Sequence, residues 1–324
     1  MASRSDPRSL VANIRHHAWP AIGIAAVAFS SWLLYHEVRG LSLDDVVDSL
    51  NAISWPRWLL AAAATFCAYG ALAWYDRIAL LHLGKRLSWP FISLCSFTAY
   101  AIAHNIGASV LSGAVVRYRA YTSQGLTVAE VGVLVALCSF TFALGTIVLG
   151  GLVLLVDPDL VGRFLDLPDG IPIAASVAML GFVLVYVAGA CLKLRPLSIG
   201  RLKIYYPRLP IVARQLVAGP LELLGAAAIV YFALPDQGNP GFLIVLGIFL
   251  ASFSVALLSH APGGLGVLEV MFLTGLPEMD AADVLAALIV FRILYLLVPL
   301  AFSLIVILLF EHSQLARGLL TKAP

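Results

Sequence analysis

Six apolar segments of this chain are each long enough to cross the hydrocarbon core of a bilayer, which takes about 20 residues of helix. They cover residues 18–36, 58–80, 128–156, 171–193, 212–234 and 284–310. Only 12% of the 324 residues are charged, and 61% are hydrophobic, whereas a soluble domain is about 25% charged. This small number of charged residues cannot cover the surface of a water-soluble globule. The composition therefore predicts an all-α, polytopic membrane protein.

Two further apolar regions, 90–121 and 241–276, follow a different pattern. Each holds a first apolar run, a glycine-rich break and a second run that is short for a full crossing. We therefore predict two helical hairpins, either re-entrant or formed from two short crossings, and about eight passes in all. Irregular backbone survives at membrane depth only beside protein or water that satisfies it, so both breaks mark candidate functional positions.

Basic residues are concentrated in alternate connections, which predicts the orientation because basic loops stay in the cytoplasm. They stand in the N-terminal tail, at 85–86, in the loop 193–214 and near the C-terminus, while acidic residues dominate the intervening loops. This alternation requires each hairpin to return to the side from which it entered, and it leaves both termini in the cytoplasm. The predicted organisation is a tail 1–17, a transmembrane region 18–310 and a tail 311–324.

The two breaks also resemble each other in sequence. Ala103–Ala108 reads AHNIGA and Ser259–Gly264 reads SHAPGG, and each lies inside a unit of helix, hairpin and helix, over 58–156 and 212–310. By the charge pattern, the first hairpin enters from the cytoplasm and the second from outside, so the repeats are predicted to be inverted. Inverted repeats with broken helices near the midplane are a plan used by alternating-access transporters.

The second break has the more specific pattern. Pro262 lacks a backbone donor and is expected to end the preceding helix near His260. Gly263, Gly264 and Gly266 permit a tight reversal and a close approach of backbone or ligand. A helix that starts after Gly264 would have free amides and partial positive charge, which suit a phosphate. The alternative is a tight hairpin that only packs.

Three ionisable residues fall inside apolar runs: Glu222, Glu269 and Arg292. An ionisable group at this depth costs at least ~2.5 kcal/mol unless it is paired or hydrated. We expect Arg292 to pair with Glu269 or Glu222 and to line a polar cavity. A purely structural ion pair between helices is the alternative.

The first break contains His104, Asn105 and Gly107, and His104 is equivalent to His260 in the other repeat. Neither histidine has a second ligand at helical spacing, so both are interpreted as hydrogen-bonding or substrate-contacting groups and no metal site is predicted. Asn105 is placed to bond carbonyl groups that the break releases.

Two arginines, Arg117 and Arg119, close the first hairpin. They either contact an anionic headgroup or snorkel to the cytoplasmic interface. The basic loop 193–214 either attracts anionic lipid or only reflects the orientation rule.

The sequence has no phosphate-binding loop, dinucleotide fingerprint or hydrolase motif, so neither a cofactor, ATP hydrolysis nor nucleic-acid binding is predicted.

The runs Ala99–Gly107, Gly113–Arg119 and Pro262–Glu269 resemble the lysylphosphatidylglycerol synthase transmembrane family. That family includes the N-terminal flippase region of the bacterial multiple peptide resistance factor. The resemblance covers about 20–310, and it implies translocation of aminoacylated phosphatidylglycerol, or a related lipid, across the bacterial inner membrane. The soluble synthase domain of that factor is missing from this sequence, so no enzyme activity is expected. A separate synthase partner and a homo-oligomer stay open.

The leading hypothesis is therefore a lipid flippase. The phosphate of a headgroup would lie near Gly264–Gly266 and Arg292, and Glu269 or Glu222 would balance a cationic headgroup, with proton coupling through these glutamates left open. The rivals are an ion-coupled transporter of a small solute, an intramembrane enzyme acting on lipid, and a scaffold for a partner synthase. A cavity open sideways to lipid favours the flippase, and one open only to water favours the solute transporter.

Overall fold

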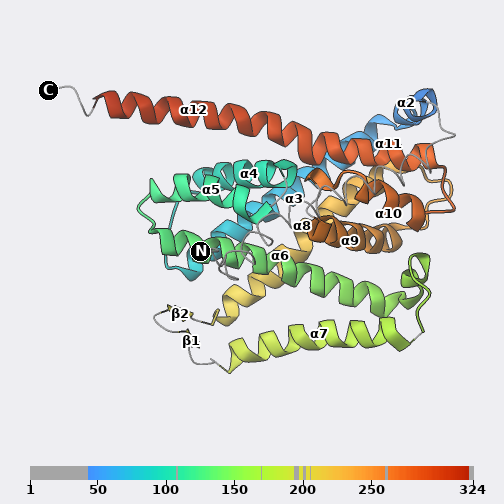
Figure 1. Cartoon of the computed structure of the whole chain (residues 1–324), viewed down its shortest axis with the longest axis horizontal. Helices are drawn as coiled ribbons and strands as arrows, with labels where there is room; N and C mark the ends of the chain where they lie inside the picture. The colour runs from blue at the N-terminus through green and yellow to red at the C-terminus, as the bar shows by residue number, and fades with distance from the viewer. Residues whose placement is uncertain are drawn as a thin grey trace, which may run out of the picture.

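The computed structural model describes residues 43–106, 109–168, 170–192, 197–199, 202–204, 206–259 and 262–320. Over these ranges the chain is almost entirely helical, which confirms the predicted all-α membrane class (Figure 1). The strands β1 (Leu197–Ile199) and β2 (Leu202–Ile204) form a small antiparallel ribbon in the basic loop. The predicted span 18–36 and the predicted tail 1–17 lie outside the described residues, and the helix α12 continues into the predicted C-terminal tail.

The helices form two units of the same order. The first consists of α3 (Trp55–His82), α4 (Trp89–Ile106), α5 (Ser109–Thr122) and α6 (Val128–Val156). The second consists of α8 (Leu209–Ala233), α9 (Phe242–Ser259), α10 (Val267–Gly275), α11 (Ala281–Phe291) and α12 (Val298–Leu320). The helix α2 (Leu43–Ala52) precedes them, and a 3₁₀ turn (Pro158–Arg163) and α7 (Gly170–Cys191) join them. In Figure 1, α7 and α12 lie along opposite edges and α8 passes between them.

Six stretches of the described chain are long and apolar enough to cross a membrane. They are α3, α6, α7, α8, α9 and the continuous stretch Ala281–Leu309. Five of these agree with predicted spans. The sixth, α9, was predicted as the first limb of a hairpin, and its 18 residues alone reach the length of a crossing. A chain with this many apolar helices is a multi-pass membrane protein, because only regular hydrogen-bonded backbone is stable in lipid.

Two ion pairs at the helix ends show that the hairpins enter from opposite ends of the bundle. Lys85, in the turn before α4, lies 2.9 Å from Glu130 in the first turn of α6. Arg163, just beyond the other end of α6, lies 2.9 Å from Glu278 in the turn after α10. Since α6 spans the distance between these contacts, the hairpins α4–α5 and α9–α10 open at opposite ends of α6. The inverted relationship of the two repeats stays a prediction.

Glycines let the long helices approach closely at the centre of the bundle. A Cβ on Gly145 of α6 would lie 2.5 Å from the backbone carbon of Gly219 on α8. On another side of α8, a Cβ on Gly225 would lie 3.0 Å from the carbonyl oxygen of Ala64 on α3. Small residues at helix crossings are the usual means of packing helices in lipid, because no hydrophobic effect drives the helices together there.

Candidate functional site

The two predicted breaks lie next to each other inside the bundle. The backbone of Gly263, Gly264 and Gly266 has positive φ angles of 59°, 63° and 76°, a conformation that glycine adopts without steric cost. A Cβ on Gly263 would lie 3.9 Å from the carbonyl oxygen of His104 at the end of α4, and 3.7 Å from Nη1 of Arg292. The reversal of the second hairpin therefore fits between the first break and an intramembrane arginine.

Three of the predicted site positions cannot be placed fully. Gly107 and His260 lie outside the described residues, and only the backbone of Pro262 is described. The backbone from Pro262 to Gly264 forms a short 3₁₀ turn, in line with the helix end predicted for this region.

Arg292 pairs with Glu269, which is one of the two partners predicted for it. Its Nε and Nη2 lie 2.9 and 2.5 Å from Oε1 of Glu269, and its Nη1 donates to the carbonyl oxygen of Gly263 at 3.0 Å. The other carboxylate oxygen accepts the backbone N–H of Gly266 at 2.8 Å. The prediction of free amides at this helix start is therefore wrong for Gly266, because Glu269 from the same first turn already occupies that donor.

Glu222 has a different environment from Glu269. It lies midway along α8, only 2% exposed, and its Oε1 accepts the hydroxyl of Tyr295 at 2.6 Å. Its Oε2 is buried and has no hydrogen-bond partner among the described residues. The ring of Tyr295 also stacks on the ring of His104, with centroids 5.2 Å apart, and His104 Nδ1 is buried with no partner in the described part of the chain. Tyr295 therefore connects Glu222 with the end of the first hairpin's leading helix.

The helix that carries Arg292 is itself irregular. Residues Arg292–Leu297 form a π-helical turn between α11 and α12, a form that is rare and frequent at functional sites. Two of its carbonyl groups accept bonds from neighbouring helices: Tyr69 donates to Tyr295 at 2.9 Å, and Asn105 donates to Leu296 at 3.1 Å. Asn105, predicted to bond carbonyls at the break, thus ties the end of α4 to this turn.

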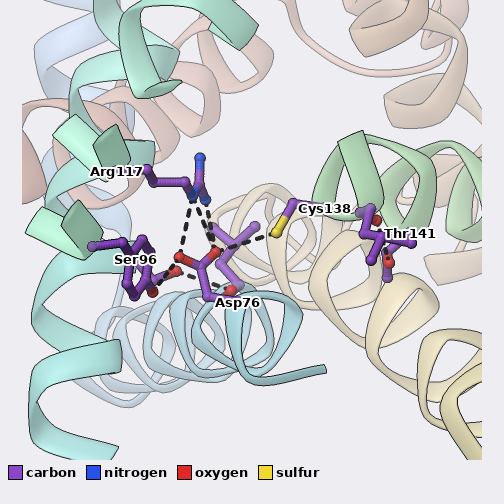
Figure 2. A network of polar contacts seen from close by, with 8 residues as sticks. Asp76, Ser96, Arg117, Cys138 and Thr141 are labelled. Atoms are coloured by element: carbon purple, nitrogen blue, oxygen red, sulfur yellow. Dashed lines mark hydrogen bonds and ion pairs between the residues drawn. The ribbon is translucent and has the colours of Figure 1, made fainter. Parts of the chain in front are cut away.

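A second buried ion pair, which the sequence analysis missed, joins Arg117 to Asp76. Nε of Arg117 lies 3.1 and 3.2 Å from the two carboxylate oxygens, and Nη2 lies 2.9 Å from one of them. Figure 2 shows Asp76 between Arg117 on one side and Cys138, whose thiol donates to it at 3.3 Å, on the other. Tyr121 donates to the same carboxylate at 2.8 Å. The guanidinium also lies 4.4 Å from the ring centroid of Tyr100.

This pair corrects the interpretation of Arg117. The residue is 4% exposed, so it neither snorkels to the interface nor meets a headgroup in this arrangement. In the sequence, Arg119 follows two positions after Arg117 at the close of the hairpin, and these two charges favoured an interface position. No local pattern indicates that Asp76, 41 positions earlier, is the partner of Arg117.

An apolar groove runs along the first hairpin, between α4, α5 and α12. It encloses about 570 Å³ and is lined by Phe91, Leu94, Cys95, Thr98, Val115, Val116, Arg119, Ala120, Val306, Ile307 and Leu309. Leu94 and Val115 are 49% and 61% exposed, so the groove lies at the outer surface of the bundle. Its lining contains a single charged side chain, Arg119, which comes from the last turn of α5.

Metal chemistry finds no support in the described part of the chain, where no three His, Cys, Asp or Glu side chains gather in positions to hold an ion. The cysteines are free thiols: Cys95 and Cys138 are buried, and Cys67 and Cys191 are exposed. Chemistry in the bundle therefore centres on two buried ion pairs, a third carboxyl group and the backbone of a glycine turn.

These features define a class: a multi-pass helical membrane protein in which two broken-helix hairpins enter from opposite ends and meet beside buried charges. Within that class, the chain belongs to the family described as the lysylphosphatidylglycerol synthase transmembrane region, which matches residues 21–303.

The chain is also similar to three curated proteins. An uncharacterized protein of Synechocystis, slr0712, is 30% identical over 305 residues and 92% of each chain. The inner membrane protein YbhN of Escherichia coli is 28% identical over 265 residues, 79% of this chain and 80% of that protein. A phosphatidylglycerol lysyltransferase of Staphylococcus epidermidis is 32% identical over 110 residues, which cover 33% of this chain and only 13% of that enzyme.

Proposed function

We propose that the protein translocates a phospholipid, anionic or aminoacylated, across the bacterial inner membrane, with both of its termini in the cytoplasm. The observation that carries the proposal is the meeting of the two hairpins: the turn at Gly263 lies against the carbonyl of His104 and against Arg292. Polar groups from the two hairpins thus lie next to each other within the bundle. A headgroup on this path would contact them, whereas a headgroup that crosses hydrocarbon alone contacts no polar group. Membership of a family that is named for the transmembrane region of lysylphosphatidylglycerol synthase also supports a lipid substrate.

The pair Arg292–Glu269 suits a headgroup that carries both a phosphate and an ammonium group. In the closed pair, each charge neutralises the other and the carbonyl of Gly263 takes a further donor of Arg292. A headgroup that separates the pair would offer its phosphate to Arg292 and its ammonium group to Glu269. Both buried charges then stay compensated, which avoids the loss of about 3–5 kcal/mol that follows when one partner of a buried pair is left alone.

The groove along the first hairpin favours a lipid over a soluble solute. Its lining is apolar except for a few polar groups, and exposed Leu94 and Val115 border it on the outer surface of the bundle. A transmembrane surface of this kind faces acyl chains rather than water. One acyl chain would lie in this groove, which Arg119 borders from the last turn of α5.

In this proposal the chain moves lipid and does not synthesise it. Any aminoacyl lipid would come from a separate synthase, and an association with that synthase, or with a second copy of the chain, would shorten the path of the lipid between them.

Reconstituted protein tests the proposal directly. The transfer of labelled phosphatidylglycerol and labelled lysyl- and alanyl-phosphatidylglycerol between leaflets would be measured in proteoliposomes that contain the wild type, Arg292→Ala or Glu269→Gln. We expect each substitution to slow transfer at least about tenfold, which corresponds to ~1.4 kcal/mol in the barrier.

The matched control is the pair Arg163–Glu278, which joins the same types of side chain at the partly exposed end of the bundle. Arg163→Ala and Glu278→Gln should leave transfer close to the wild-type rate. If correctly inserted Arg292→Ala and Glu269→Gln proteins transfer every lipid as fast as the wild type, the proposed site is wrong.

A further inference from the structure

Two glutamates of the described chain lie inside the bundle, and among the described residues only one of them has a cation beside it. Glu269 contacts the guanidinium of Arg292 and accepts the N–H of Gly266, so both of its oxygens are satisfied. Glu222 accepts one hydrogen bond, from the hydroxyl of Tyr295, and its second oxygen is enclosed without a donor among the described residues. The two carboxyl groups therefore differ in how fully their oxygens are compensated.

An ionised carboxylate at Glu222 would have no positive charge beside it among the residues that the structure describes. The removal of such a charge from water is so unfavourable that a group without a partner takes up a proton instead. One hydrogen bond from a neutral phenol does not replace a cation. We infer that Glu222 is a proton-binding site, and that the protonation and deprotonation of this side chain couple lipid movement to the flow of protons. The coupling step rests on the proposed function, whereas the binding of the proton does not.

The titratable groups around Glu222 add no positive charge. The described groups that interact electrostatically with Glu222 are Tyr69 and Tyr75 from α3, Tyr100 from α4 and Tyr295 from the π-helical turn. Beyond them, His104 stacks on Tyr295, and Cys138 of α6 donates to Asp76. The helix α9, which also packs against α8, carries no titratable side chain. Tyrosine and cysteine are neutral near pH 7. The two nearby guanidinium groups, of Arg117 and Arg292, are each bound to another carboxylate.

Tyr295 links the protonation state of Glu222 to the packing of the hairpins. Its hydroxyl donates to Glu222, its ring stacks on His104 at an angle of 19°, and its carbonyl group accepts from Tyr69. A protonated Glu222 is compatible with the closed packing around Tyr295. An ionised Glu222 favours any arrangement that admits water or a cation, so the protonation state biases the equilibrium between closed and open forms.

The buried Nδ1 of His104 is a second polar atom without a partner in this cluster. Such atoms are rare in folded proteins and usually mark an ordered water or a functional group. Since His104 and Glu222 contact the same tyrosine, a water between the two orphaned atoms would give the proton a path toward the first break. In each cycle the carboxylate takes one proton from water on one side, carries it as an O–H at Oε2, and returns it to water on the other.

Infrared difference spectroscopy on the purified protein tests the proton site without any transport. A pH step between about 5 and 9 should change the carbonyl band of a protonated carboxylic acid in the wild type. Glu222→Gln, which imitates the protonated side chain, should fold and lose that band. The matched control, Glu269→Gln, should keep the band, because it leaves the contact between Glu222 and Tyr295 in place.

Tyr295→Phe provides an independent check, because it keeps the carboxyl group and removes its only hydrogen bond from the described residues. The band should then shift to the frequency of a carboxylic acid without a hydrogen bond. A wild type that shows no such band, or a band that persists in Glu222→Gln and does not move in Tyr295→Phe, would overturn the assignment.

A pH gradient across proteoliposomes tests the coupling step. One unit of pH supplies about a tenfold driving force for each coupled proton, so it should raise lipid accumulation in one leaflet of wild-type vesicles by up to that factor. Glu222→Gln should exchange lipid with no response to the gradient. A mutant that responds like the wild type overturns the coupling. Absence of any lipid transfer by the wild type contradicts the proposed function instead, and the spectroscopic result then still decides whether Glu222 binds the proton.

Discussion

Arg117 on α5 and Asp76 on α3 form an ion pair in which the guanidinium reaches both carboxylate oxygens, and the side chains are only 5% and 0% exposed. The second hairpin repeats this relationship with the charges reversed: Glu269 on α10 pairs with Arg292 at the start of the π-helical turn. The returning limb of each hairpin is thus tied to a long helix by an ion pair, which is buried in the first hairpin and mostly buried in the second. Since the surrounding helices are apolar, these pairs are strong determinants of where each hairpin sits.

The first prediction concerns the stability that depends on the Arg117–Asp76 pair. Asp76→Asn or Arg117→Ala should lower the free energy of unfolding by about 3–5 kcal/mol, because each leaves a buried charge without its partner. The double substitution Asp76→Leu with Arg117→Met should destabilise the protein by less than the two single substitutions added together. It still leaves the hydroxyl of Tyr121 without its acceptor, which costs about 1–3 kcal/mol. Chemical unfolding in detergent micelles measures these differences.

The partly exposed pair Arg163–Glu278 is the control for this series, and its removal should change stability by only about 0–1 kcal/mol. If the single substitutions at Asp76 and Arg117 cost no more than those at the control pair, the buried pair does not anchor the hairpin.

The second prediction concerns the contact between α6 and α8. Gly145→Ala should destabilise the protein by at least about 1–3 kcal/mol, because its new methyl group would lie 2.5 Å from the backbone of Gly219 and push the helices apart. Gly132→Ala on the same helix meets nothing within 4 Å, and it should be neutral or stabilise by about 0.5–1 kcal/mol. Thermal unfolding of the two variants side by side measures the difference, and equal melting temperatures would contradict the packing described here.

The third prediction tests the groove. Val116→Trp fills space between α5 and α12, so it should slow lipid transfer about tenfold if an acyl chain occupies the groove, a change of ~1.4 kcal/mol in the barrier. Val177→Trp on α7 adds the same bulk to a position that is 62% exposed and away from the groove, and it should leave the rate unchanged. Transfer assays in proteoliposomes compare them, and an unaffected Val116→Trp would remove the groove from the lipid path.

The fourth prediction concerns the sidedness of the chain. In a background with Cys67→Ser and Cys191→Ser, which removes the two exposed thiols, Ser123→Cys should react with impermeant maleimide from the cytoplasmic side. Gln237→Cys, in the turn between α8 and α9, should react only from the other side. Met279, in the turn after α10, is 9% exposed and would be a poorer reporter than Gln237. Reaction of both cysteines from the same side would exclude the inverted orientation.

The sequence by itself determined the class of fold and the position of both hairpins. A long uncharged run such as Val131–Val156 has one stable form in lipid, a helix that satisfies its own backbone. Proline and glycine at Pro262–Gly266 end such a run for reasons that act within a few residues. The depth of Arg292 and Glu269 in apolar runs was sufficient to predict that the arginine needs a carboxylate partner.

Only the tertiary structure decided which carboxylate that is and which charges are buried. Along α3 and α8 nearly every face is apolar, so the pattern does not show how far a helix is rotated toward its neighbours. Asp76 and Arg117 stand 41 positions apart and meet because α5 folds back against α3. Glu222 remains without a cation because the turn at Gly263 brings Arg292 to Glu269 instead. The choice of ion-pair partner depends on the distances between helices. Close contacts such as Gly145–Gly219 set these distances, and the local sequence does not encode them.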